Sequence, residues 1–145
     1  MMTIHQLSIF IENKSGTLVQ VLNLLKNEGI QLVASTISDT TEYGIYRIIC
    51  SEPMRAYKAM EQAGIAVNLT DVFALKLDNR PGCAADAIAV LREAGINISY
   101  LYSFLLSEKG ILVFRTDNPD ITRETILLNK LNYVGEDELI SLIDS

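Results

Sequence analysis

The chain contains the same sequence pattern twice. Residues 4–63 align without a gap with residues 70–129 at an offset of 66 positions, the separation of Gly16 from Gly82. Further matches at this offset are Asn13 with Asn79, Gly29 with Gly95, Gly44 with Gly110, and Pro53 with Pro119. Glycine and proline mark positions where backbone angles are unusual or restricted. Agreement at such positions predicts one fold built twice.

The repeat divides the chain into two small domains, residues 1–70 and residues 71–145. Each half has the order strand, helix, strand, strand, helix, strand. This βαββαβ order is the ferredoxin-like arrangement, in which two helices cover one face of an antiparallel sheet. The expected fold class is therefore α+β, with two such units in tandem.

Hydrophobic periodicity and turn residues give the expected elements. In the first half they predict strands over residues 6–12, 31–38, 43–50 and 67–71, and helices ending at Gly29 and Gly64. The second half repeats this pattern up to its last long helix, which begins at Pro119. We expect that helix to be about two residues longer than its counterpart, so that the repeat slips near residues 132–133. Residues 138–143 fit either a short helix or an edge strand.

The two halves are expected to be docked. Residues 67–71 run directly into the strand at residues 72–77, with no Gly, Ser or Pro linker between them. A domain of about 70 residues is also marginal alone. The strand at residues 97–106 is apolar on both of its faces, although helices cover only one. An exposed apolar face needs a cover, and we expect a second copy of this chain to form a homodimer there.

Charge and composition exclude several functions. The net charge is −6, and an acidic surface repels phosphate backbones, so we expect no nucleic-acid partner. Tyr100, Tyr102 and Phe104 are similar to base-stacking residues of related folds, but no basic stripe accompanies them. No apolar run approaches the roughly 18 residues of a membrane span. The N-terminal residues lack the features of a signal peptide, which predicts a cytoplasmic protein whose two cysteines stay reduced.

The sequence offers little for catalysis. His5 is the only histidine, and Cys50 and Cys83 have no CxxC spacing. There is no phosphate-binding GxxxxGK[ST] loop and no GxGxxG. We therefore predict no enzyme activity, no metal and no cofactor.

The two strand-to-helix turns are the candidate binding features. Asn13 and Asn79 each stand three residues before a glycine, at the start of a helix. One interpretation is a tight turn, which Asn and Gly suit. The other is a ligand site, because the first N–H groups of a helix favour a carboxylate and an asparagine amide can bind a second polar group. That set of groups suits a free amino acid.

Two segments of the second half, Asn79-Arg80-Pro81-Gly82 and Ala94-Gly95-Ile96-Asn97-Ile98, resemble the signature of the ACT domain. The first half carries looser copies at residues 13–16 and 29–32, without the proline. The resemblance covers nearly the whole chain. It implies tandem ACT modules that bind a free amino acid between them and regulate a separate enzyme of amino-acid metabolism. The alternative is a structural or assembly subunit of such an enzyme, with degenerate sites.

The resemblance also implies the ligand-binding residues. Asn79 and Gly82 would face Gln31, and Asn13 and Gly16 would face Asn97. The full expected set is Ile11, Asn13, Ser15, Gly16, Thr17, Leu18, Gln31, Leu77, Asn79, Pro81, Gly82, Cys83, Ala84 and Asn97. Serine, histidine, or a branched-chain or aromatic amino acid would each fit as the ligand.

Overall fold

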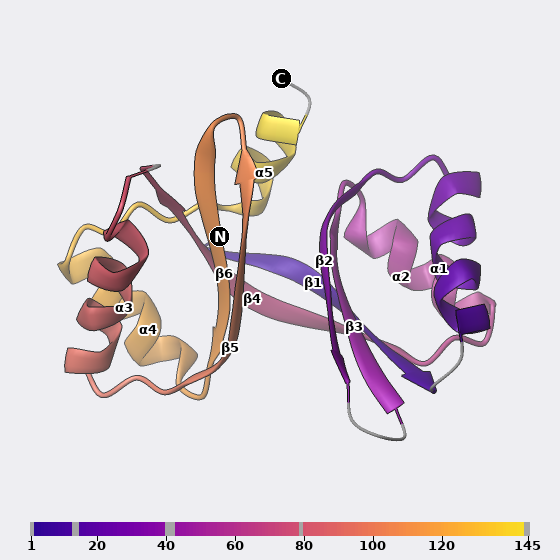
Figure 1. Ribbon diagram of the computed structural model, residues 1–145, viewed down its shortest axis with the longest axis horizontal. Coiled ribbons are helices and arrows are strands. Elements are labelled where there is room, and N and C mark those ends of the chain that lie inside the picture. Colours follow the sequence, from indigo (N-terminus) through magenta and orange to yellow (C-terminus); the bar gives the residue numbers. More distant parts are fainter. Residues whose placement is uncertain (1, 13–14, 40–42, 79, 144–145) are drawn as a thin grey trace. The chain divides into compact units, whose positions relative to one another are not determined.

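The structure is a computed structural model that describes residues 2–12, 15–39, 43–78 and 80–143 (Figure 1). Its elements are β1 (Thr3–Glu12), α1 (Ser15–Asn27), β2 (Leu32–Asp39), β3 (Tyr43–Cys50), α2 (Pro53–Gln62), β4 (Val67–Leu77), α3 (Cys83–Glu93), β5 (Ile98–Leu106), β6 (Lys109–Thr116), α4 (Pro119–Leu128) and α5 (Glu136–Ile143). The chain divides into two compact units. The first unit is His5–Thr70, and the second comprises residues 2–4 and 71–143.

Each unit has the ferredoxin-like layering that the sequence predicts. Hydrogen-bonded neighbours follow the order β2-β3-β1-β4 in the first unit and β1-β4-β6-β5 in the second, since β1 and β4 contribute residues to both. Within the first unit, α1 and α2 lie on the same side of the strands (Figure 1). Within the second, α3 and α4 do the same. The α+β fold of two tandem modules is thus confirmed.

The repeat extends to the register of the strands. In the first unit, Ile11 of β1 pairs with Gly44 of β3. In the second, Leu77 of β4 pairs with Gly110 of β6, which is the same pair at the 66-residue offset. Both units also have an irregularity at the start of the strand that follows the first helix, between Leu32 and Ala34 in β2 and at the matching place in β5. The two modules can therefore be compared position by position.

The expected lengthening of the last long helix is wrong. Helices α2 and α4 both have 10 residues. Nor does the repeat slip at residues 132–133: Phe10 N–H donates to the Ala66 carbonyl at 3.0 Å, and Lys76 N–H donates to the Asn132 carbonyl, the same pair at the same offset, at 2.7 Å.

The sequence feature that made the last long helix seem longer lies at the C-terminus of α4. Gly64, just after α2, has a φ of +77°, and the matching residue after α4 is Lys130, with a φ of +52°. A glycine in the left-handed region is the usual sign that a helix ends. Because lysine replaces it in the second module, the sequence gives no such sign, although the backbone turns in the same way.

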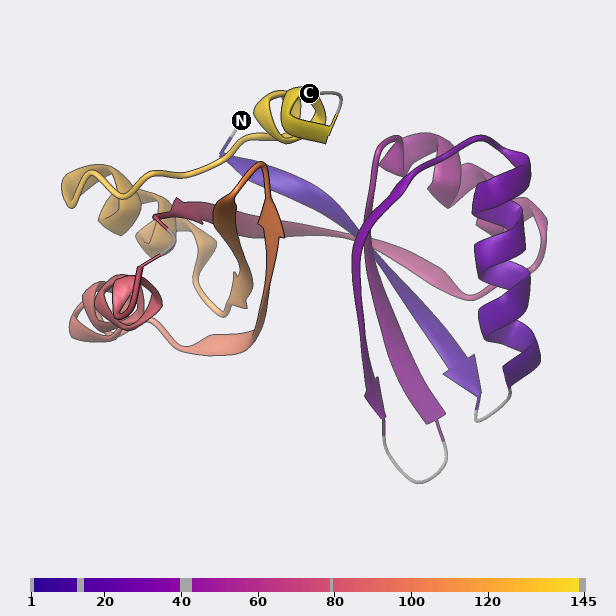
Figure 2. The same ribbon diagram turned by 45° about the horizontal axis from the view of Figure 1, so that its top comes forward.

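Beyond Val134 the modules differ, and residues 136–143 form the helix α5. Lys76 lies between Leu75 and Leu77, which pack toward α3 and α4, so its side chain points to the opposite face of the sheet. Its Nζ contacts Glu138 Oε2 of α5 at 2.7 Å. Figures 1 and 2 show α5 on the other side of the β5–β6 hairpin from α3 and α4. The chain therefore covers part of this face with its own helix, whereas a second copy was expected there.

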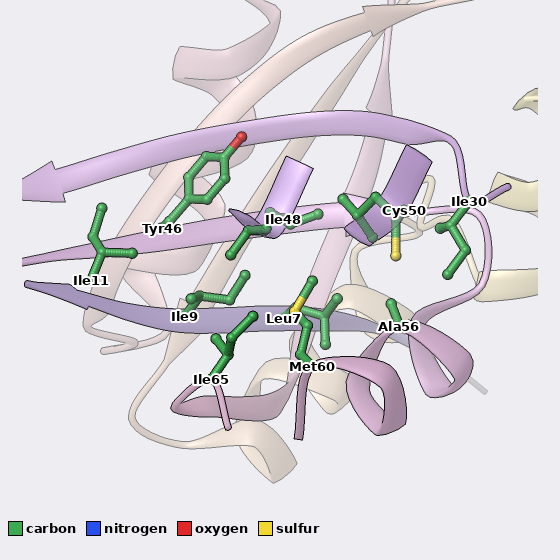
Figure 3. Close-up of a cluster of buried hydrophobic side chains, with 12 residues drawn as sticks. Leu7, Ile9, Ile11, Ile30, Tyr46, Ile48, Cys50, Ala56, Met60 and Ile65 are labelled. Carbon is green, nitrogen blue, oxygen red and sulfur yellow. The ribbon is translucent and has the colours of Figure 1, made fainter. Parts of the chain in front are cut away.

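Each unit has its own apolar core between the sheet and its pair of helices. Figure 3 shows the first core, whose strand residues include Leu7, Ile9 and Ile48. In the second core Phe73 and Phe114 stack with ring centroids 5.7 Å apart. These cores fix the helices to the sheet, and so they fix the turns at which the helices begin.

Candidate functional site

The turn from β4 into α3 exposes the N-terminus of a helix. Gly82 is the N-cap residue and has a φ of +89°. This is a left-handed backbone conformation that residues other than glycine rarely adopt. Its carbonyl accepts the N–H of Asp86 at 2.9 Å, which begins the hydrogen bonds of the helix. The Cys83 N–H donates to the Arg80 carbonyl at 3.4 Å, and the next N–H groups, those of Ala84 and Ala85, precede that ladder at the end of the helix with partial positive charge. Gly82 has no side chain that could cap them.

A cavity of about 340 Å³ lies beside this helix start, within the second unit. It is bounded by the β4–α3 turn, the first turn of α3 and the end of the β5–β6 hairpin. Its lining residues are Leu77, Asp78, Arg80, Cys83, Ala84, Ser103, Phe104, Leu105, Gly110, Ile111 and Leu112. The size is in the range of small-molecule sites in proteins.

The walls are largely apolar and the rim is charged. Leu77 and Leu112 belong to or pack against the second core, whereas Leu105 is 66% exposed. At the rim, Asp78 is paired with Lys109, Nζ to Oδ1, at 3.2 Å. Within the part of the chain that the structure describes, the guanidinium of Arg80 has no ion-pair partner. The guanidinium of Arg80 therefore adds a positive charge to the rim next to the helix N-terminus.

Expected site residues of the second module gather at this cavity. Leu77, Cys83 and Ala84 line it, and the exposed Pro81 and Gly82 form the adjacent turn. Asn79 lies outside the described residues. Asn97 lies at the opposite end of the module, where its Nδ2 donates to Asp117 Oδ2 at 3.2 Å.

Expected site residues of the first module are distributed differently. Ile11 is buried in the first core, and Leu18 packs against that core. Gly16 is exposed and Thr17 half-buried. Gln31 is exposed, and its backbone N–H donates to Ser51 Oγ at 2.9 Å. Asn13 and the side chain of Ser15 lie outside the described residues.

Sequence reasoning missed the strand side of the cavity, including Ser103, Leu105 and Leu112. The signal was available in the pairing of β5 with β6. Ser103 pairs with Leu112, and directly paired residues point to the same face. Leu112 belongs to the second core, so Ser103 and its alternate neighbour Leu105 face the helices. The sequence does not indicate which end of the sheet lies next to the N-terminus of α3.

Other kinds of site find little support. Among the residues that the structure describes, no group of three or more His, Cys, Asp and Glu side chains could hold a metal ion. Over the same residues, none of the helices is long and apolar enough to cross a membrane. Among the residues that the structure describes, Cys50 and Cys83 form no disulfide; the first is buried and the second is half-buried at the cavity.

Comparison with known proteins gives a consistent result. The family described as an ACT domain pair matches residues 2–143. The crystal structure of protein BT0572 from Bacteroides thetaiotaomicron is similar over 96% of both chains, with 38% identity and a TM-score of 0.90. The ligand-free regulatory subunit of aspartate kinase from Thermus thermophilus shares the fold at 13% identity and a TM-score of 0.57, over 88% of this chain and 93% of that one. Among curated proteins, none matches this chain.

Proposed function

The chain belongs to the family of ACT domain pairs, and from this premise we propose that it is a cytoplasmic, non-catalytic sensor of a free amino acid that regulates a separate enzyme of amino-acid metabolism. The observation that supports this most directly is the cavity of the second module at the N-terminus of α3. Its position matches the turn that carries the ACT signature, Asn79 to Gly82.

The chemistry of the cavity fits an amino acid. A carboxylate at the first turn of α3 would accept hydrogen bonds from the backbone N–H groups there. The positively charged side chain of Arg80 lies at the rim of the same cavity. The walls formed by Leu77, Leu105 and Leu112 suit an apolar side chain. A charged side chain against those leucines would be costly unless it found a partner. We therefore propose a ligand with an uncharged, apolar side chain.

The resemblance adds a second half to the proposed site. It implies that a polar residue from a neighbouring ACT module, Gln31, completes the site around Asn79. A Gln31→Ala variant should then weaken binding in the whole protein. Sedimentation at several concentrations tests the accompanying proposal that two chains form a homodimer.

The proposal is tested by calorimetric titration of the protein with each of the twenty amino acids. We expect binding in the micromolar to millimolar range, about −4 to −8 kcal/mol. Gly82→Ala should weaken it about tenfold or more, because the added Cβ strains the turn that presents the N–H groups. Gly95→Ala is the matched control: it lies at the other end of α3 with a φ of +76°, and neither added Cβ would meet an atom within 4 Å. If none of the twenty amino acids binds, the proposal that the protein is an amino-acid sensor is rejected.

A second candidate is the structural or assembly subunit. It is favoured by the first turn, residues 13–16, which departs from the ACT pattern by lacking the proline. A subunit of this kind would associate with its enzyme partner to the same extent with and without amino acids. Partner association that changes with an amino acid would instead support the sensor.

A further inference from the structure

The two modules share their backbone around the helix start but differ in the side chains that they place there. Because the register is the same in both, each cavity residue has a counterpart 66 positions earlier. Ser38 is smaller than its counterpart Phe104, but three residues of the first module are larger by two or more non-hydrogen atoms: Leu18 at the position of Ala84, Ile37 at that of Ser103 and Tyr46 at that of Leu112. Together these three exchanges add about as many non-hydrogen atoms as a molecule of leucine contains.

In the first module Tyr46 and Leu18 occupy the space between helix and sheet, whereas Ile37 is 46% exposed. Tyr46 is only 5% exposed and is a member of the first core, against which Leu18 packs. The Tyr46 hydroxyl donates to Ser35 Oγ at 3.1 Å, which fixes its ring along the sheet. Figure 3 shows Tyr46 and Ile11 on neighbouring strands of this core. Leu112 and Tyr46 are thus both buried in their cores, and the larger tyrosine takes up more of the space between helix and sheet in the first module.

Gly110, which lines the cavity, and its counterpart Gly44 give an independent indication that the first module is packed more tightly. A Cβ on Gly44 would meet the Ile11 side chain at 3.4 Å. A Cβ on the matching Gly110 would meet nothing nearer than the Leu77 carbonyl at 3.8 Å. The difference has the same direction as the exchange of side chains: among the residues that the structure describes, the first module is packed more tightly at this position than the second.

We propose that each chain binds one amino acid, in the second module, and that the first module is a filled counterpart without a ligand of its own. This inference rests on the proposed function for the identity of the ligand. It assigns Ala84 and Ser103 as the residues whose small size keeps the site open. It assigns Tyr46 and Leu18 as those that close the corresponding place in the first module.

Titration of the whole protein with each of the twenty amino acids measures the stoichiometry, which should be one per chain. Ala84→Leu gives the second module the residue of the first and should weaken binding about tenfold or more. Ala85→Leu is the matched control, because Ala85 is the exposed neighbour on the same helix turn and does not line the cavity. Two ligands per chain, or unchanged binding by the Ala84→Leu variant, would overturn the inference.

A probe that needs no amino acid separates this inference from the proposed function. If none of the twenty amino acids binds, the proposed function fails, and the open and filled modules can still be compared with xenon, which enters apolar cavities. Under xenon pressure the methyl NMR signals of Leu77 and Leu105 should shift, and those of Ile11 and Leu18 should not. Equal shifts in both modules would overturn the inference whatever the amino acids do.

Discussion

Replacing Lys130 with glycine should stabilise the second module. Lys130 follows α4 with a φ of +52°, in the left-handed region. Its N–H donates to the Leu127 carbonyl at 3.2 Å, and the next N–H, that of Leu131, donates to the Ile126 carbonyl at 3.0 Å. These bonds hold the residue in this conformation. Its counterpart Gly64 adopts a similar φ without a Cβ.

The magnitude follows from two opposing terms. An L-residue in the left-handed region costs about 1–2 kcal/mol relative to its usual conformation. Glycine removes that strain but makes the unfolded chain more flexible, which costs about 0.4–1 kcal/mol. The Lys130→Gly variant should therefore gain roughly 0.5–1 kcal/mol in the free energy of unfolding. Lys130→Ala keeps the Cβ and the strain, so it should change stability by less than about 0.5 kcal/mol.

Urea denaturation monitored by circular dichroism measures both variants. The midpoint should rise for Lys130→Gly with an unchanged m-value, since the native fold exposes the same surface on unfolding. If the two modules unfold in separate transitions, only the transition of the second should move. A Lys130→Gly protein no more stable than the Lys130→Ala protein would refute the reasoning that the backbone, and not the lysine side chain, sets the difference.

Three further outcomes are expected. Ser107 and Glu108 form the β5–β6 turn with φ values of +50° and +64°, so replacing them with Asn-Gly should stabilise the protein by about 1 kcal/mol in the same urea assay. Leu139 of α5 is 2% exposed, and Leu139→Ala should cost about 2–5 kcal/mol, seen as an earlier thermal transition. Leu105→Glu should shift binding from apolar amino acids toward lysine in calorimetry, whereas Leu101→Glu, on the same strand outside the cavity, should not.

The sequence predicts the repeated backbone because backbone constraints are local. Glycine and proline restrict φ at their own positions, so their recurrence is visible without knowledge of the fold. Lys130 shows where this information ends, since there the hydrogen bonds of the helix end impose the same φ on a residue that does not favour it. The helix α5 could not be assigned because a segment of its length fits either type of element until its packing partner is known.

The candidate site is predicted only in part for a different reason. The turn at residues 79–82 and the start of α3 are adjacent in the sequence, and their pattern marks them. Ser103 and Leu112 come from other strands, so they reach the cavity only through the pairing of β5 with β6. Whether Tyr46 fills the space in the first module that corresponds to the cavity depends on how far its side chain reaches into the core. The alternation of residues along a strand does not predict this.

The division of β1 between the two units makes the order of synthesis important. Thr3 and Ile4 are 6% and 1% exposed, and Met2 packs against the core of the second unit, although the 66 residues from His5 to Thr70 separate them from the rest of that unit. A ribosome therefore delivers the first residues of the second module long before its last ones. A fragment beginning at Asp71 would lack these residues, whereas the fragment His5–Thr70 contains every residue of its own unit. An N-terminal tag, or a short deletion at the N-terminus, would consequently disturb the second unit, which is made mostly of C-terminal residues.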